Sequence, residues 1–308
     1  MGISSFKTGL MKRSFLAGNS VYGSVARGLF AGGVVSGSAS NIIDYISVAT
    51  TGNATDFGDL TAARDTLSAC ASSTRAIFFP GAGSNLRIDY VEIATTGNAT
   101  TFGSPSMGSY VNAAVNNSTR GVFAIGQRDT APTGRSDVIE YITIATTGNS
   151  TDFGDLTVAR AALGAVCSTT RGVFIGGLNG SDVMDYITTA TTGNATSFGT
   201  LATGITYVTG ASNSTRGLFG SGQAIRYITI ATTGNSDSFG NLTNASYVYL
   251  TGLASSTRAV FSTFYTSTGL NNIEYFTIAT TGNATDFGDL TVARYAGAGT
   301  SSFNGGLS

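Results

Sequence analysis

Residues 141–160 read YITIATTGNSTDFGDLTVAR, and the middle of this stretch decides the fold. Asp152-Phe153-Gly154 has the form of the magnesium-binding motif of protein kinases. A kinase also needs a Gly-rich loop, a strand lysine and a catalytic His-Arg-Asp, and this chain contains no histidine. The triplet is therefore not a catalytic loop, and its surroundings give it another meaning.

The quoted stretch is one copy of a repeat. Ala-Thr-Thr-Gly-Asn occurs six times at intervals of 41–51 residues, beginning at Ala49, Ala94, Ala145, Ala190, Ala231 and Ala279. A tyrosine precedes each copy and a Phe-Gly pair follows it. The full Asp-Phe-Gly is present in only three copies, at Asp56, Asp152 and Asp286. A period of this length indicates a repeat architecture.

Each unit is predicted to contain four short strands. In the third unit these are residues 120–125, 138–144, 151–156 and 160–167. β-branched and aromatic residues dominate the first two, as strands prefer, and Gly148-Asn149 suits a turn with positive φ. The fourth segment is rich in Ala and Gly, which favours a crowded position next to a central axis. Six such units predict an all-β fold, a six-bladed β-propeller of four-stranded antiparallel blades.

The unit resembles the kelch repeat. The resemblance rests on a strand ending in Gly-Gly (Gly32-Gly33 and Gly176-Gly177), an acidic-x-Tyr pattern, a later aromatic residue and a (V/A)AR segment before the small-residue strand. This chain departs from the kelch pattern because Phe replaces the Trp and the Gly pair is eroded in the other copies. The resemblance implies a propeller, and since kelch propellers serve many functions it implies little about activity.

The two ends of the chain are expected to meet in one blade. The last copy ends with a small-residue strand, residues 292–301, and stops where the next strand should begin. That missing strand is found at Arg27, near the other end of the chain, and pairing the two would remove an exposed sheet edge. The rival arrangement uses residues 19–26 as the missing strand and leaves the C-terminus free.

Residues 1–26 are interpreted as an N-terminal arm, separate from a propeller of residues 27–308. The arm holds both lysines, Lys7 and Lys12, together with Arg13 and no acid, so its formal charge is +3 against −4 for the remainder. Its segment Phe15-Leu-Ala-Gly-Asn19 resembles an N-terminal segment of virion structural proteins from marine phages of cyanobacteria. The blades that contain the Ala-Thr-Thr-Gly-Asn motif also resemble blades of such proteins. The resemblance implies virion docking through Lys7, Lys12, Arg13 and Phe15, and the alternative is a flexible basic tail.

Variable loops indicate where a partner could bind. The segment between the Arg and the Tyr of each unit varies from 11 to 21 residues, whereas the rest of the unit keeps its length. In repeat proteins the face that carries insertions is often the binding face. The longest segment is also the most polar, which makes Gln127, Arg128, Asp129 and Arg135 candidate binding residues. A solvated loop without a binding role is the competing interpretation.

Other recurrent residues are interpreted as scaffold. One set of arginines opens the units and is expected to form ion pairs within a blade or hydrogen bonds with strand ends, although a ring of arginines could also bind an anion: Arg75, Arg120, Arg171, Arg216 and Arg258. Asp59, Asp155 and Asp289 recur at one position of the repeat, which indicates a structural role for these carboxylates as well. Cys70 and Cys167 are interpreted as small core residues, because two thiolates without His make a poor zinc site.

Composition narrows the functional classes. Charged residues make up 11% of the 308 residues and the formal net charge is −1, so no nucleic-acid partner is expected. No apolar run is long enough for a membrane span, and the N-terminus lacks the apolar core of a secretory signal. Without His, the chain lacks the usual general base near neutral pH and the commonest metal ligand, so it is expected to be neither an enzyme nor a metal or cofactor protein.

The favoured hypothesis is a non-enzymatic structural protein of a phage virion, in the tail, a fibre or the capsid decoration. Its expected partners are other virion proteins, reached through the arm, and a glycan or protein of the host surface. The alternative is a lectin-type propeller that binds carbohydrate between blades or on the variable-loop face. A propeller hydrolase ranks below both, because only scattered single residues such as Arg87 and Arg226 fall outside the repeat.

Overall fold

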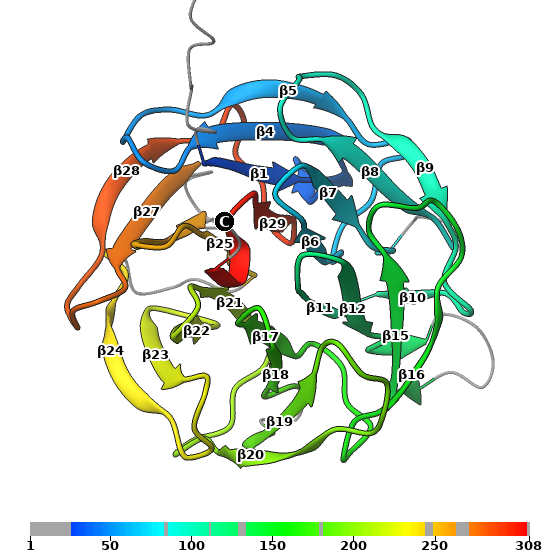
Figure 1. Ribbon diagram of the computed structural model, residues 1–308. Coiled ribbons are helices and arrows are strands. Elements are labelled where there is room, and N and C mark those ends of the chain that lie inside the picture. Colours follow the sequence, from blue (N-terminus) through cyan, green and yellow to red (C-terminus); the bar gives the residue numbers. More distant parts are fainter. Residues whose placement is uncertain are drawn as a thin grey trace, which may run out of the picture.

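The computed structural model describes residues 26–82, 86–110, 112–128, 134–178, 181–243, 249–262 and 271–306. These residues form an all-β protein with six four-stranded antiparallel sheets. Figure 1 shows the sheets side by side around a centre, like the blades of a propeller. The prediction of an all-β fold built from four-stranded antiparallel sheets is therefore confirmed.

Each four-stranded sheet extends from an innermost strand near the centre to an outermost strand at the rim. In this order, the first two sheets are β29 (Ala298–Ser301), β1 (Arg27–Ala31), β4 (Ile42–Ser47), β5 (Thr55–Asp59), and β6 (Ala69–Ala71), β7 (Arg75–Phe78), β8 (Ile88–Glu92), β9 (Thr100–Gly103). The next two are β11 (Ala113–Asn116), β12 (Arg120–Ala124), β15 (Val138–Thr143), β16 (Thr151–Asp155), and β17 (Gly164–Cys167), β18 (Arg171–Ile175), β19 (Val183–Thr188), β20 (Thr196–Thr200). The last two are β21 (Thr209–Ser212), β22 (Arg216–Gly220), β23 (Ala224–Thr229), β24 (Asp237–Asn241), and β25 (Thr251–Ala254), β26 (Arg258–Ser262), β27 (Asn272–Thr277), β28 (Thr285–Asp289).

Smaller elements complete the described part of the chain. A hairpin joins β2 (Val34–Val35) to β3 (Ser38–Ala39). A three-stranded sheet contains β10 (Ser109–Tyr110), β13 (Gln127–Arg128) and β14 (Gly134–Arg135). One 3-10 turn, η1 (Asn304–Gly306), follows β29. Among these residues no helix has the length and apolarity that a membrane span requires.

The strand beside β1 comes from the other end of the chain. β29 pairs antiparallel with β1, with Gly28 opposite Ser301 and Ala31 opposite Ala298. The innermost strands also contact each other in the cyclic order β29, β6, β11, β17, β21, β25 and back to β29. Small residues dominate these strands, as expected for strands packed around a centre.

The innermost strand is shorter than predicted. The sequence predicts an extended segment over residues 160–167, yet β17 begins only at Gly164. Arg160 is instead buried in an ion pair, and Ala162 has a φ of 55°, a left-handed conformation that no strand can contain. The prediction is wrong for residues 160–163, where the positive φ of Ala162 interrupts the extended backbone before β17 begins.

The Phe of each Phe-Gly pair is the extra residue of a β-bulge. Between β4 and β5, Asp44 pairs with Asp56 and Ile43 with Gly58, so Phe57 has no partner residue. The same register shift recurs between the two outer strands of all six sheets. A bulge redirects the side chain, and Phe57 is buried with its ring edge-on to Tyr45, 6.0 Å between centroids. The kinase-like Asp-Phe-Gly triplet thus serves to bury its Phe side chain in the core.

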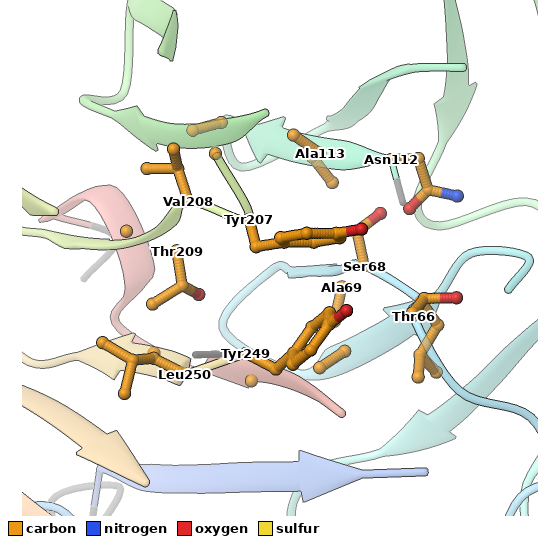
Figure 2. Close-up of a pocket in the computed structure, with 18 of the residues that line it drawn as sticks. Thr66, Ser68, Ala69, Asn112, Ala113, Tyr207, Val208, Thr209, Tyr249 and Leu250 are labelled. Atoms are coloured by element: carbon orange, nitrogen blue, oxygen red, sulfur yellow. The ribbon is translucent and has the colours of Figure 1, made fainter. Parts of the chain in front are cut away.

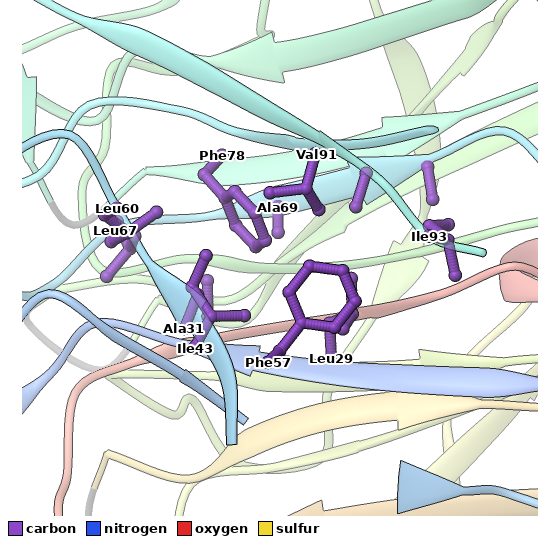
Figure 3. Close-up of a cluster of buried hydrophobic side chains, with 13 residues drawn as sticks. Leu29, Ala31, Ile43, Phe57, Leu60, Leu67, Ala69, Phe78, Val91 and Ile93 are labelled. Carbon is purple, nitrogen blue, oxygen red and sulfur yellow. The ribbon is translucent and has the colours of Figure 1, made fainter. Parts of the chain in front are cut away.

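The hydrophobic core lies between neighbouring sheets. Figure 3 shows one of its clusters, in which Leu29 and Phe57 of the first sheet meet Phe78 and Ile93 of the second unit. Because both faces of each sheet are covered, the strands carry apolar residues on both sides. Glu140 and Asp185 are nevertheless buried within them.

Candidate functional site

The outer rim is a repeated junction between neighbouring sheets. The Thr-Thr-Gly-Asn turn of one unit lies along the outer strand of the preceding unit: Gly97 N donates to Phe57 O (2.8 Å) and Ala99 N to Asp59 O (2.7 Å). The turn's Asn98 side chain accepts from Asp59 N at 3.0 Å. The same contact joins the last unit to the first, where Gly52 N donates to Phe287 O at 2.7 Å.

The arginines that open the units are part of this scaffold. Each guanidinium stacks over the Tyr ring of its own sheet, with 4.3–4.9 Å from Cζ to the ring centroid. Five of the six also donate to two carbonyls of the next unit; Arg171, for example, reaches Ile230 O and Ala231 O at 3.1 and 2.8 Å. The prediction of hydrogen bonds to strand ends is confirmed, and these bonds join one unit to the next.

Among the described residues, three buried ion pairs lie in the junctions between units. Arg64 pairs with Asp89 (3.1 Å), Arg160 with Asp185 (2.8 Å) and Arg294 with Asp44 (2.9 Å), all six side chains at most 3% exposed. Burial lowers the pKa of each of these arginines, while the paired carboxylate opposes that shift. The third pair connects the C-terminal part of the chain with the first sheet.

Three of the four predicted loop residues lie in a small three-stranded sheet. Gln127 and Arg128 lie in β13, opposite Tyr110 and Ser109 of β10, and Arg135 is opposite Gln127 in β14. Gln127 and Arg128 are half-buried, whereas Arg135 is exposed. Arg128 Nη2 donates to the buried Ser136 Oγ at 3.4 Å. The structure therefore brings these three residues together on a small sheet.

The remaining predicted site residues lie outside the described residues. These are Asp129 of the loop and the four arm residues Lys7, Lys12, Arg13 and Phe15. Cys70 and Cys167 are buried free thiols whose pKa is raised by burial, to about 11 for Cys167. Their interpretation as core residues agrees with this burial.

A pocket at the centre of the ring was not predicted from the sequence. It is lined by the residues just before and at the beginning of the innermost strands, including Tyr207 and Tyr249, and has a volume of about 110 Å³ (Figure 2). The two rings lie 4.4 Å apart between centroids and are inclined by 52°. Burial and then a hydrogen bond with Tyr207 raise the pKa of Tyr249 to about 12.

The pocket lies on the face that carries the variable loops. Successive antiparallel strands reverse direction. The segment that enters the innermost strand and the loop between the second and third strands therefore lie at the same end of the strands. Tyr207 and the described residues Gln127, Arg128 and Arg135 therefore belong to one face. A repeat-by-repeat comparison could have located the pocket, since Tyr207 and Tyr249 occupy a slot where other units have Thr66 or Ala162.

The opposite end of the centre is capped by the C-terminal turn. η1 contacts β11, β17, β21 and β25. Asn304 Nδ2 donates to Asn116 Oδ1 at 3.1 Å, and a Cβ added to Gly305 would lie 2.6 Å from Cys167 Sγ. The central pocket is therefore backed by the chain itself on one side.

No protein-family model matches the chain, and no curated protein is significantly similar to it.

Proposed function

We propose that this chain is a kelch-like, six-bladed β-propeller that serves as a non-enzymatic structural protein of a phage virion. Ring closure is supported by three contacts between the ends of the chain: the β29–β1 pairing, the Gly52 N to Phe287 O bond and the Arg294–Asp44 ion pair. Each contact has counterparts between consecutive units elsewhere in the chain. These shared contacts support a ring in which the last unit lies next to the first.

The observation that carries the structural role is how the repeated polar groups are used. Five of the six arginines over the tyrosines bind the next unit, the turn asparagines bind the preceding unit, and the buried ion pairs join consecutive units. Even the carboxylates that fall in the core have partners: Asp89 accepts from Thr61 Oγ1 and from its backbone N, and Glu274 accepts from Thr243. Their geometry supports a rigid disc that presents loops.

The arm is the proposed docking element. Its charge of +3, the Phe15-Leu-Ala-Gly-Asn19 segment and the resemblance to cyanophage virion proteins support attachment of residues 1–26 to another virion protein. In this proposal Lys7, Lys12, Arg13 and Phe15 contact the particle. The variable-loop face, with Gln127, Arg128 and Arg135, would then be displayed toward a host-surface protein or glycan.

Deleting residues 1–26 tests this proposal. The truncated chain should remain folded, with the far-ultraviolet circular dichroism of the full chain, and should no longer be found in purified phage particles when the two versions are expressed during infection. A Lys7→Ala, Lys12→Ala, Arg13→Ala triple variant should show the same loss if charge is responsible. Incorporation of the truncated chain at the level of the full chain would refute the docking role.

A further inference from the structure

The central pocket contains two tyrosines in a strained backbone conformation. Tyr207 has a φ of 53° and Tyr249 of 63°, in the left-handed region that bulky residues rarely adopt. The equivalent positions of other units have the same conformation but smaller side chains: Thr66 (52°), Ala162 (55°) and Ala296 (56°). The fold sets the backbone, and these two units place a large ring on it. Such outliers concentrate at functional sites.

Polar groups without partners lie beside the rings. Ser68 and Asn112 line the pocket and are only 8% and 7% exposed. Within the described part of the chain, Ser68 Oγ and Asn112 Oδ1 have no hydrogen-bond partner, although Asn112 Nδ2 donates to Pro80 O at 2.7 Å. Figure 2 shows Ser68 and Asn112 at the end of the pocket toward which the Tyr207 hydroxyl points. Buried polar atoms normally have partners, so a ligand or ordered water has a place in this pocket.

The lining is uncharged. Among the residues that the structure describes, no Asp, Glu, Lys or Arg borders the pocket, and Ala and Gly backbone makes up much of its remaining surface. Its volume of about 110 Å³ is well above the roughly 10–15 Å³ that a single water needs, so the pocket has room for a small ligand. The tyrosines are half-buried, so one part of each ring remains open to solvent.

We propose that this pocket binds one neutral pyranose ring of a glycan. The faces of Tyr207 and Tyr249 would pack against the apolar side of the sugar, while Ser68 Oγ and Asn112 Oδ1 would bond to its hydroxyls. An ammonium ligand would also favour tyrosine rings, but a buried site for a cation gains from a carboxylate, and the described lining has none. The inference depends on the pocket alone and stands whether or not the chain is part of a virion.

The test uses the full chain and a panel of methyl glycosides. The chain has 13 tyrosines and no tryptophan, so tyrosine fluorescence can report on ligand binding at the pocket without interference from tryptophan. Methyl glucoside, methyl galactoside, methyl mannoside and N-acetylglucosamine are titrated in the millimolar range, with tetramethylammonium as the cationic probe. Isothermal calorimetry checks each affinity. At least one sugar should bind saturably at one site per chain, and tetramethylammonium should not bind.

Each variant uses a residue that another unit already has at that position. Tyr249→Ala copies Ala162 and Ala296, Asn112→Leu copies Leu67, and Ser68→Ala copies Ala298, so folding should be retained and is checked by circular dichroism. Each change should weaken sugar binding about tenfold, the effect of one lost hydrogen bond to a buried group or one lost stacking ring. Tyr110→Ala, in β10 and outside the pocket, should not.

Three results would overturn the proposal. They are no saturable sugar binding by the full chain, binding that survives Tyr249→Ala and Asn112→Leu unchanged, and binding of tetramethylammonium in place of sugar.

Discussion

The rim and the centre of the ring use the same repeat in opposite ways. At the rim, every Phe-Gly glycine faces the backbone of the next turn; a Cβ on Gly154, for instance, would lie 2.6 Å from Gly193 O. At the centre, the left-handed slot has one backbone conformation but holds Thr66, Ala162, Tyr207, Tyr249 and Ala296. A side chain at the rim would collide with the next unit, whereas a side chain at the centre extends into a pocket.

This difference separates architecture from recognition. Where a repeated position touches the backbone of a neighbour, its residue type is dictated in every unit. Where a repeated position faces open space, a single unit can carry a different side chain there without disturbing the packing of the ring. Substitutions at the rim should therefore change stability, and substitutions at the centre should change binding.

The largest effect is expected from the ion pair between the ends of the chain. Arg294→Met removes a guanidinium that also donates to Phe30 O at 3.0 Å and leaves Asp44 buried without its cation. Breaking one partner of such a pair costs about 3–5 kcal/mol, which urea denaturation would measure. The double variant Arg294→Met, Asp44→Asn should recover part of this loss, since no buried charge then lacks a partner. A cost below about 1 kcal/mol for the single variant would mean that the ends of the chain are not joined as described.

Two glycines in one junction can be compared to measure the steric contribution of close backbone packing to stability at the rim. An added Cβ on Gly240 would overlap the carbonyl oxygen of Gly282, whereas a Cβ on Gly282 itself would meet no atom within 4 Å. Gly240→Ala should therefore destabilise the protein by about 2–3 kcal/mol, the cost of overpacking against backbone. Gly282→Ala is the matched control and should have a much smaller effect in the same thermal denaturation. Equal effects of the two changes would show that close approach is not the reason for the glycine.

Comparing the arginines of two neighbouring units gives the contribution of the hydrogen bonds across a junction to the free energy of unfolding. Arg171 donates to two carbonyls, whereas Arg120 stacks on Tyr141 at 4.6 Å but has a buried Nη1 without a partner among the described residues. Arg171→Met should therefore cost about 1–2 kcal/mol more than Arg120→Met, the contribution of the additional bonds. Paired urea midpoints give the difference. If the two variants lose the same stability, stacking on the Tyr ring accounts for the whole contribution of these arginines.

Much of the scaffold could be predicted from the sequence because the repeat makes each position visible six times. The strand order within a sheet, the small residues of the innermost strands and the pairing partner of β1 follow from spacing and residue size. The β10–β13–β14 sheet could not be predicted in this way. Two of its strands, β13 and β14, lie in the longest Arg-to-Tyr segment, whereas β10 comes from the preceding unit, and loop length does not indicate such a pairing.

The candidate pocket escaped prediction for a different physical reason. Tyr207 and Tyr249 come from different units, 42 positions apart, and they become neighbours only when the innermost strands converge. In the sequence, Ser68 and Asn112 look like ordinary polar loop residues. Only their burial in the fold separates their side chains from solvent. A deviation from the repeat can mark such residues, but only their convergence in space defines a site.

The smallest effect concerns the acidity of Tyr249 at the centre. Because the folded chain raises the pKa of Tyr249 from 10.0 to about 12, folding favours the neutral phenol. Its contribution to stability is present below pH 10 and is lost as the pH rises from about 10 to 12, where the unfolded chain has released the proton and the folded chain has not. Tyrosinate absorbance of the folded protein should contain a late-titrating phase that Tyr249→Phe removes and Tyr110→Phe leaves in place. The urea midpoint should also fall less steeply across this range in Tyr249→Phe than in the original chain. A late phase that persists in Tyr249→Phe would place the acidity elsewhere, and would indicate that the central pair of rings is more open to water than its geometry requires.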